Sequence, residues 1–306
     1  MDKTIITAAI TGAVHVPSLS PYLPVTPEQI IADAVGAAEA GASVVHIHAR
    51  NPQTGEPSSD LEIMRKIVTE INRQTDAVIC VTTGASQLMT VEERLSPIPE
   101  LQPELASCNA GSMNFVLSGM IAKLPDTALE WEAKYLLSTK QNIFSNTYGG
   151  MEQYIKTMRQ YGTAIEFEVY DVGMINNLAY FKRQGLLKEP IYLQFVLGVQ
   201  GGIPSSVENI VFLKNTADRQ LEDYVWSVAS AGRHQLPVAA AALAMGANIR
   251  VGLEDNLYIK PGILAKSSAE QVIAVRTIAE LVGKEIATPD EVRQILKLKG
   301  KKKLGF

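Results

Sequence analysis

The stretch Val44-Val45-His46-Ile47-His48-Ala49-Arg50 contains two of the four histidines of the chain, two residues apart in an apolar setting. Side chains alternate between the two faces of a β-strand, so Val44, His46, His48 and Arg50 share one face, and Val45, Ile47 and Ala49 form an apolar opposite face. A predicted helix ends just before this stretch, at Ala40-Gly41, and a turn follows at residues 51–55. The pattern predicts a buried strand that carries two imidazoles near its end.

This histidine pair is open to two interpretations. Both side chains are either core histidines satisfied by neighbouring groups, or a metal-binding pair. Neutral imidazole nitrogens suit zinc, and alternate positions of a strand can close on one ion. The second interpretation requires a third ligand from another part of the chain.

Segments typical of strands and of helices alternate on both sides of this stretch. Further strands are predicted at residues 4–13, 77–83, 105–111, 164–171, 191–197, 224–229 and 248–253. Helices are predicted near residues 27–40, 60–73, 131–138, 151–161, 175–184, 206–216, 235–245, 269–282 and 289–298. Two of these helices open with an N-cap threonine, a proline and a capping-box residue, in Thr26-Pro27-Glu28-Gln29 and Thr288-Pro289-Asp290-Glu291.

This alternation predicts parallel βαβ units in one continuous architecture. Eight strands fit a closed (β/α)₈ TIM barrel that forms a single catalytic domain over residues 1–306, provided that the extended segment 142–146 belongs to an insertion. An open, doubly wound sheet is the alternative.

Composition narrows the class of protein. Apolar residues make up 46% of the 306 positions and charged residues 20%, which are globular values, and no apolar run is long enough to predict a membrane span. No signal peptide is visible at the N-terminus, so we expect a cytoplasmic protein. The net charge of −4 does not predict nucleic-acid binding. Cys80 and Cys108 lie in strand-like runs, where reduced and buried thiols are expected.

In a TIM barrel the chemistry lies at the C-terminal ends of the strands. These ends carry Thr11, Gly12, His46, His48, Thr82, Thr83, Gly84, Ser107, Asn109, Glu166, Glu168, Arg250, Glu254 and Asp255. By strand parity Arg250 and Glu254 share a face, and Asp255 follows at the strand exit. Glu254 is therefore a candidate third metal ligand, and Asp255 with Arg250 a candidate base with its electrostatic partner. An ion-paired surface turn is the alternative interpretation.

Weaker signals lie in loops. Gly198-Val199-Gln200-Gly201-Gly202 follows a strand and could let the backbone approach a phosphate or a thioester, although a plain turn explains the glycines as well. His15 and His234 are candidate substrate contacts or simply polar loop residues. The basic tail at residues 297–303 is most simply a solvated end of a helix.

Several motifs, taken in order, resemble those of the β-keto acid cleavage enzymes. They are Thr7-Ala-Ala-Ile-Thr-Gly-Ala13, His46-Ile-His48, Thr83-Gly84, Asn109-Ala-Gly111, Glu166-Phe-Glu168-Val-Tyr170, Phe195-Val-Leu-Gly198 and Arg250-Val-Gly-Leu-Glu254-Asp255-Asn256. The match runs from about residue 4 to residue 298. The resemblance implies a zinc-dependent TIM barrel, usually a homotetramer, that converts a β-keto acid and acetyl-CoA into acetoacetate and a new acyl-CoA.

The resemblance also implies roles for individual residues. His46, His48 and Glu254 would bind Zn²⁺, while Asp255, Arg250 and Glu168 would form the catalytic group. The implied substrate-binding residues are Val14, Thr82, Thr83, Gly84, Ser107 and Asn109. Val14 stands where family members acting on 3-keto-5-aminohexanoate carry a glutamate that faces the substrate ammonium, and the region around residues 131–150 is longer here. The resemblance therefore implies a neutral or anionic β-keto acid.

Two other functions remain as alternatives. One is a zinc hydrolase of the amidohydrolase type, whose barrels also carry His-x-His, although only His15 and His234 remain as further histidines and neither lies at a clear strand end. The other is a metabolite-binding protein without catalysis.

Overall fold

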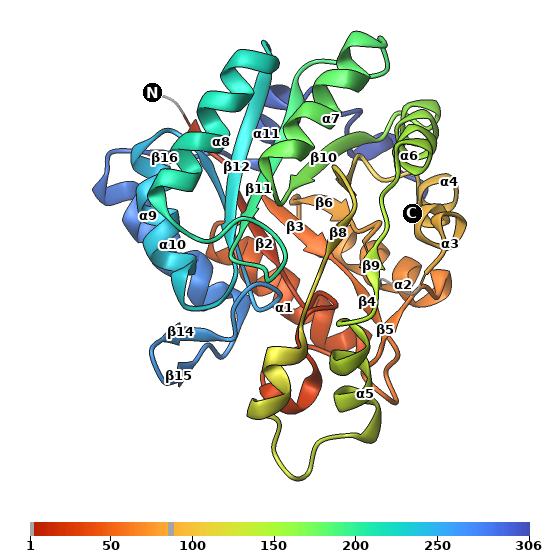
Figure 1. The fold of residues 1–306 in the computed structure, drawn as a ribbon, viewed down its shortest axis with the longest axis vertical. Helices are drawn as coiled ribbons and strands as arrows, with labels where there is room; N and C mark the ends of the chain where they lie inside the picture. Colours follow the sequence, from red (N-terminus) through yellow and green to blue (C-terminus); the bar gives the residue numbers. More distant parts are fainter. Residues whose placement is uncertain (1–2, 85–88) are drawn as a thin grey trace.

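Eight parallel strands close into a barrel at the centre of the molecule (Figure 1). This computed structural model describes residues 3–84 and 89–306. The barrel strands are β2 (Ile6–Ala9), β3 (Val44–Ile47), β6 (Val78–Val81), β7 (Leu105–Asn109), β10 (Ala164–Val169), β11 (Ile191–Leu197), β12 (Tyr224–Ser230) and β13 (Asn248–Val251). They follow one another around the barrel in chain order, and β13 pairs with β2 to close it. The expected TIM barrel is confirmed, and the open sheet is wrong.

Helices surround the barrel and connect its strands (Figure 1). They are α1 (Pro27–Ala40), α2 (Leu61–Gln74), α3 (Val91–Leu95), α4 (Pro97–Leu101), α5 (Glu130–Ser138), α6 (Tyr148–Gln160), α7 (Val172–Arg183), α8 (Val207–Gln220), α9 (Gln235–Ala244), α10 (Ser268–Leu281) and α11 (Pro289–Ile295). Both predicted capping boxes are present, at the starts of α1 and α11. In each, the threonine side chain accepts the N3 amide and the N3 side chain accepts the threonine amide, so two unpaired helix-end donors are satisfied locally.

The inside of the barrel has an apolar layer at its N-terminal end. This layer contains Ile5, Val44, Val78, Leu105 and Tyr192, and Val292 of α11 packs into the same cluster. Two positions further along four of these chain segments the buried side chains are polar: Thr7, His46, Ser107 and Gln194. The period of two along each strand thus keeps apolar packing at one end and places polar groups toward the end where the strands finish.

Several predicted strands end earlier than expected, and two of these differences affect the site. Residues 4–13 contribute only Ile6–Ala9 to the barrel, because the chain turns away at Gly12, whose φ of 60° lies in the left-handed region. The stretch around the histidines divides into β3, which ends at Ile47, and β4 (Ala49–Arg50), which pairs antiparallel with β5 (Pro57–Ser58). His48 therefore lies just beyond the barrel strand.

Several elements outside the barrel were not predicted. Helices α3 and α4 fill the segment between β6 and β7, and a hairpin of β14 (Tyr258–Lys260) and β15 (Ile263–Leu264) follows β13. The extended segment near 142–146 belongs to an insertion, as expected, since β9 (Ile143–Phe144) pairs with β8 (Met113–Asn114) and not with a barrel strand. Within residues 3–84 and 89–306, we find no helix with the length and apolarity needed to cross a bilayer.

Candidate active site

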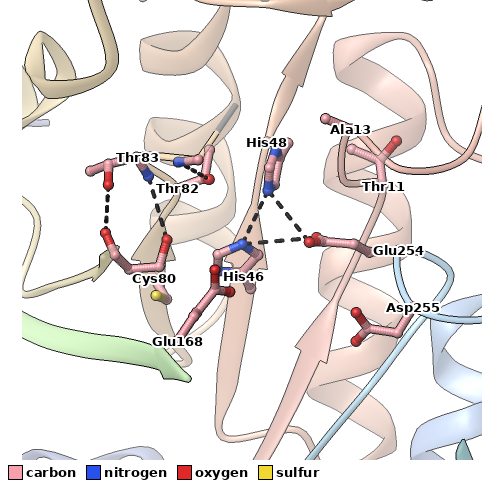
Figure 2. A network of polar contacts seen from close by, with 12 residues as sticks. Thr11, Ala13, His46, His48, Cys80, Thr82, Thr83, Glu168, Glu254 and Asp255 are labelled. Atoms are coloured by element: carbon pink, nitrogen blue, oxygen red, sulfur yellow. Dashed lines mark hydrogen bonds and ion pairs between the residues drawn. The ribbon is translucent and has the colours of Figure 1, made fainter. Parts of the chain in front are cut away.

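His46, His48 and Glu254 meet at the C-terminal end of the barrel (Figure 2). The two Nε2 atoms of the histidines lie 3.1 Å apart. Glu254 Oε2 lies 3.8 Å from His46 Nε2, and its Oε1 lies 3.5 Å from His48 Nε2. All three side chains are buried. The two histidines and the glutamate singled out in the sequence therefore form one compact cluster.

A tight turn after β13 brings Glu254 to the histidines. β13 ends at Val251, so Glu254 is not on the strand. The prediction that Arg250 and Glu254 share one strand face is therefore wrong, although the turn still brings the two side chains together. Gly252 has a φ of 145°, and a Cβ there would lie 1.9 Å from Ala9 O, so the turn packs directly on β2. The Glu254 amide then donates to Ala9 O at 3.2 Å. The turn thus carries the carboxylate across the end of β2 toward β3.

Arg250 forms the centre of the charged part of the site. Its Nη1 donates to Glu168 Oε1 at 2.8 Å and its Nη2 to Glu254 Oε1 at 2.7 Å. Asp255 accepts from Nε and Nη2, both at 3.0 Å, which is the bidentate arrangement that fixes a carboxylate in orientation. One guanidinium on β13 therefore holds three carboxylates, one from β10 and two from the turn after β13.

The buried charges shift the protonation of these groups. Burial would lower the pKa of Arg250, but the three carboxylates raise it well above its usual range. Burial would likewise raise the pKa of Glu254, but Arg250 and the two histidines hold it well below its usual range. Burial dominates for Asp255 and raises its pKa to about 6. A carboxylate with a pKa near neutrality is suited to accept and return a proton.

The cluster suits a divalent cation. Tetrahedral zinc with bonds of about 2.0–2.1 Å separates its ligand atoms by roughly 3.4 Å, and the three observed separations lie around this value. Glu254 Oε2 is buried without a hydrogen-bond partner among the described residues. Three carboxylates around one guanidinium leave two buried negative charges, if all three are ionised, and a divalent cation would neutralise them. Burial holds the pKa of His46 well below its usual range, which keeps the imidazole neutral as a metal ligand must be.

A small cavity of about 50 Å³ opens beside this cluster. The predicted site residues that line it are Val14, His48, Thr82, Gly84, Asn109, Glu168 and Glu254. The other described lining residues are Ala13, Phe115, Leu117, Tyr135, Phe144 and Tyr170. One wall therefore carries the polar groups of the strand ends, and the opposite wall is apolar and aromatic.

Hydrogen bonds fix the polar wall. Glu168 Oε2 accepts from Asn109 Nδ2 at 2.9 Å and from the Tyr170 hydroxyl at 3.2 Å. Thr82 Oγ1 accepts the Gly84 amide at 2.9 Å. These bonds hold Glu168 with both oxygens engaged, one toward Arg250 and one toward Asn109, so its position is set before any substrate enters.

Some residues expected in the site point elsewhere. Thr83 and Ser107 pair with each other, since the Thr83 hydroxyl donates to Ser107 O at 2.7 Å, and neither is among the residues that line the cavity. Arg50, predicted on the histidine face, instead donates to Thr11, Gly55 and His15 and ties the loops together. Arg50 is not on the histidine face because β3 ends at Ile47 and Arg50 lies on the separate strand β4.

The two remaining histidines differ in position. His15 Nδ1 lies 3.0 Å from Leu253 O, next to the ligand cluster, and burial lowers the pKa of His15 to about 4. His234 is exposed on the short 3₁₀ helix η3 (Gly232–His234). The glycines at 198–202 are explained by packing, since a Cβ at Gly201 would lie 1.9 Å from Asn114 O.

The sequence did not single out several residues of the site. Arg94 of α3 is buried and donates to Thr83 O at 2.6 Å and to Asn109 Oδ1 at 3.3 Å. The insertion supplies Tyr135, whose hydroxyl donates to Ala13 O at 2.8 Å, and Phe144. The capping pair Thr90 and Glu93 could have indicated α3. No local pattern indicates that Tyr135 or Phe144 reaches the cavity.

Glu166 is a further buried carboxyl, below the site. It lies within the barrel near Cys80, whose Sγ is 3.9 Å from Glu166 Oε1. Its donor atoms also group with those of His46 and Cys80. Burial raises the pKa of Glu166 to about 8, so at neutral pH the group is mostly protonated and adds little to the negative charge around Arg250. Both cysteines are free and buried, as expected.

Comparison with known proteins shows the family of this chain. The family model of the β-keto acid cleavage enzymes matches residues 3–298. The chain belongs to this family. It is 46% identical over 305 residues to the 3,5-dioxohexanoate:acetyl-CoA acetone transferase of Paraburkholderia graminis, covering 99% of this chain and 98% of that protein. It is 40% identical over 300 residues to the 3-keto-5-aminohexanoate cleavage enzyme of Fusobacterium nucleatum, covering 98% and 99%.

Among solved structures, the apo form of ObcA shares the fold with a TM-score of 0.74 at 20% identity. The alignment covers 91% of this chain and 66% of ObcA, so the chain spans just under two thirds of that longer protein. The resemblance seen in the motifs is confirmed by the family match, and so is the expected class of enzyme. The metabolite-binding alternative is therefore wrong.

Proposed function

We propose that this β-keto acid cleavage enzyme is zinc-dependent and exchanges acyl groups between a β-keto acid and acetyl-CoA, giving acetoacetate and a new acyl-CoA. The observation that carries the proposal is the buried cluster of His46, His48 and Glu254 directly beside Asp255 and Arg250. The name of the 46% identical relative, an acetyl-CoA-dependent transferase, supports acetyl-CoA as the second substrate.

The chemistry begins with loss of a proton from C2 of the keto acid. A zinc ion held by His46, His48 and Glu254 would polarise the β-keto oxygen and lower the cost of the negative charge that develops there. Asp255 accepts the C2 proton, while Arg250 keeps this carboxylate oriented through its two hydrogen bonds. The C2 carbon then attacks the thioester carbonyl of acetyl-CoA. The CoA thiolate released in this step then adds to the original β-keto carbonyl, and the bond between that carbon and C2 breaks. Asp255 returns its proton to C2, which gives acetoacetate and the new acyl-CoA.

The cavity favours a substrate with a small, uncharged tail. Its apolar wall includes Val14, Leu117 and Phe144, and no lysine or arginine is among the described residues that line it. Burying a charged tail against such a wall without a partner is costly. The relative from P. graminis is named for 3,5-dioxohexanoate, whose tail carries no charge. Within the expected neutral or anionic class, a neutral β-keto acid is therefore the better match.

Carbon labelling tests the reaction. With acetyl-CoA labelled in both acetyl carbons, the label should appear only in C3 and C4 of acetoacetate, and the new acyl-CoA should be unlabelled. Labelled free acetate as the main product would instead show the hydrolase that we keep as the alternative. Label in the new acyl-CoA would contradict the proposed order of bond formation and cleavage.

We also infer a homotetramer, as the family resemblance implies, and a cytoplasmic location. The two free, buried cysteines are compatible with a reducing compartment. Light scattering after size-exclusion chromatography tests the assembly, with a mass four times that of the 33.2 kDa chain as the expected result. Cell fractionation tests the location.

A further inference from the structure

A large groove lies at the catalytic end of the barrel, outside the small cavity already described. It has a volume of about 660 Å³, which is within the range of roughly 300–1,000 Å³ usual for small-molecule sites. The groove runs between the β14–β15 hairpin, the loop of η3 and the 3₁₀ helix η2 (Ser118–Lys123). The hairpin projects at the lower left of Figure 1.

The groove combines an apolar floor with a cationic rim. The floor is formed by Leu19, Met120, Leu236, Pro237, Leu257 and Ile259. Lys123, Arg233 and Lys260 line the rim, and all three are exposed. Within the part of the chain that the structure describes, none of the three lies within 4 Å of a carboxylate oxygen. Such a surface is complementary to a ligand with an apolar arm and several anionic groups at one end.

The groove lies next to the turn that carries Asp255. Gly232 lines the groove, and its amide donates to Asp255 O at 2.9 Å. Asn256, the next residue after Asp255, also lines it. On the opposite side the groove is lined by His15, while its neighbour Val14 lines the substrate cavity. A ligand that follows the floor inward would therefore bring its end next to the turn of Asp255 and beside the keto acid.

Two other sizeable hollows lack this connection. One, of about 650 Å³, is lined by Arg276, Glu280, Lys284 and Glu285, so its charges are mixed, and it lies at the N-terminal end of the barrel beside α11. The other includes Lys188 and Tyr192, at the start of β11, and is at that same end. Neither these hollows nor the groove shares a lining residue with the cavity beside His48, but of the three the groove alone lies at the same end of the barrel as that cavity.

We propose that the groove binds the CoA portion of the acyl donor, with the pantetheine arm along the apolar floor and the phosphates at Lys123, Arg233 and Lys260. This inference rests on the proposed function, because it assigns a place to the thioester substrate. No new bond is formed in the groove. Its role is to deliver the thioester carbonyl to the C2 carbon and to hold the CoA thiol nearby until it captures the departing acyl group.

The test reverses two rim charges, in an Arg233→Glu, Lys260→Glu double variant of the full-length protein. We expect KM for acetyl-CoA to rise about tenfold or more, because two phosphate contacts become repulsive. The ratio of kcat/KM for acetyl-CoA to that for the acetyl thioester of N-acetylcysteamine, which lacks the phosphates, should fall by a similar factor. Lys188→Glu is the matched control, since this exposed lysine is at the other end of the barrel.

Calorimetric titration with CoA tests the groove independently of the proposed acyl-exchange reaction. If the wild type binds CoA and the double variant binds it at least about tenfold more weakly, the groove is supported even if no keto acid is turned over. If turnover with acetyl-CoA proceeds and its KM is unchanged in the double variant, the groove assignment is overturned while the reaction stands. Equal loss in Lys188→Glu would also overturn it, because a general change of charge would then explain the effect.

Discussion

The guanidinium of Arg250 lies 2.8 Å from the carboxylate of Glu168, although 82 residues separate them in the chain. Arg250 is on β13 and Glu168 on β10, and two strands lie between these in the barrel. The ion pair therefore crosses the interior of the barrel and joins two of its sides. Because the same guanidinium also binds Glu254 and Asp255, it sets the distance between the candidate base, the candidate metal ligand and the polar wall of the cavity.

Removing the candidate base should abolish most of the turnover. Asp255→Asn keeps the size of the side chain but cannot accept the C2 proton, and a general base commonly contributes about 10²–10⁴-fold in rate. We expect kcat to fall by this order while zinc content and Tm stay close to those of the wild type. Asp126→Asn, at an exposed aspartate, is the control. Full activity in Asp255→Asn would assign the base elsewhere.

The histidine pair should be required for metal binding. The protein purified with zinc available should carry about one zinc per chain, because three protein ligands leave one position open for substrate. A His46→Ala, His48→Ala double variant should lose both the metal and the turnover, as elemental analysis and activity assays will show. His234→Ala, which changes an exposed histidine, should keep both. A double variant that retains zinc at this stoichiometry would place the metal at another site.

The residue at position 14 should determine whether the enzyme prefers a β-keto acid with a neutral tail or one with a cationic tail. The wild type should show a higher kcat/KM for a neutral β-keto acid than for 3-keto-5-aminohexanoate, since Val14 offers no partner to an ammonium group. Val14→Glu should shift this ratio toward the amino substrate by about tenfold or more, whereas Val14→Leu should not. A wild-type preference for the cationic substrate would mean that another group receives the ammonium.

Gly12 should be needed for the position of Glu254. Its φ is 60°, and a Cβ at this place would lie 2.2 Å from Glu254 Cγ. Gly12→Ala should therefore displace the carboxylate and weaken zinc binding by about 10–100-fold, measured by competition with a chelator. Gly36→Ala is the matched control, because a Cβ there would meet no described atom within 4 Å beyond the backbone of its own helix, and alanine favours the helix α1. Unchanged metal affinity in Gly12→Ala would show that the turn can move.

The buried Asp33 should make the stability of the fold depend on pH. Its Oδ1 accepts the Ser268 amide at 2.9 Å, and burial raises its pKa above the usual value. The folded protein then keeps this proton where the unfolded chain has released it, so stability falls as pH rises from about 4 through the folded-state pKa. The Tm of the wild type relative to Asp33→Asn should therefore decline between pH 4 and pH 7. A constant or rising difference would contradict the direction of the shift.

The sequence alone predicted the barrel, with an open sheet as the alternative that the strand pairing then excluded. Period-two apolar runs, helix caps such as Thr26 with Gln29 and the regular alternation of elements are local signals, and each acts within a few residues. The pairing of His46 with His48 is equally local, because two positions on one strand end must face the same side. The motif around Arg250 was recognised as part of the site for the same reason, since its members are consecutive in the chain.

Only the tertiary structure decided how the site is assembled. Glu254 reaches the histidines through a turn that packs on β2. The alternation of side chains along a strand cannot predict such a turn. The walls of the cavity come from Tyr135 and Phe144 in the insertion, and the polar wall is braced by Arg94. These contacts join residues tens of positions apart, so they depend on how loops pack over the barrel end, and no local pattern in the sequence encodes that packing.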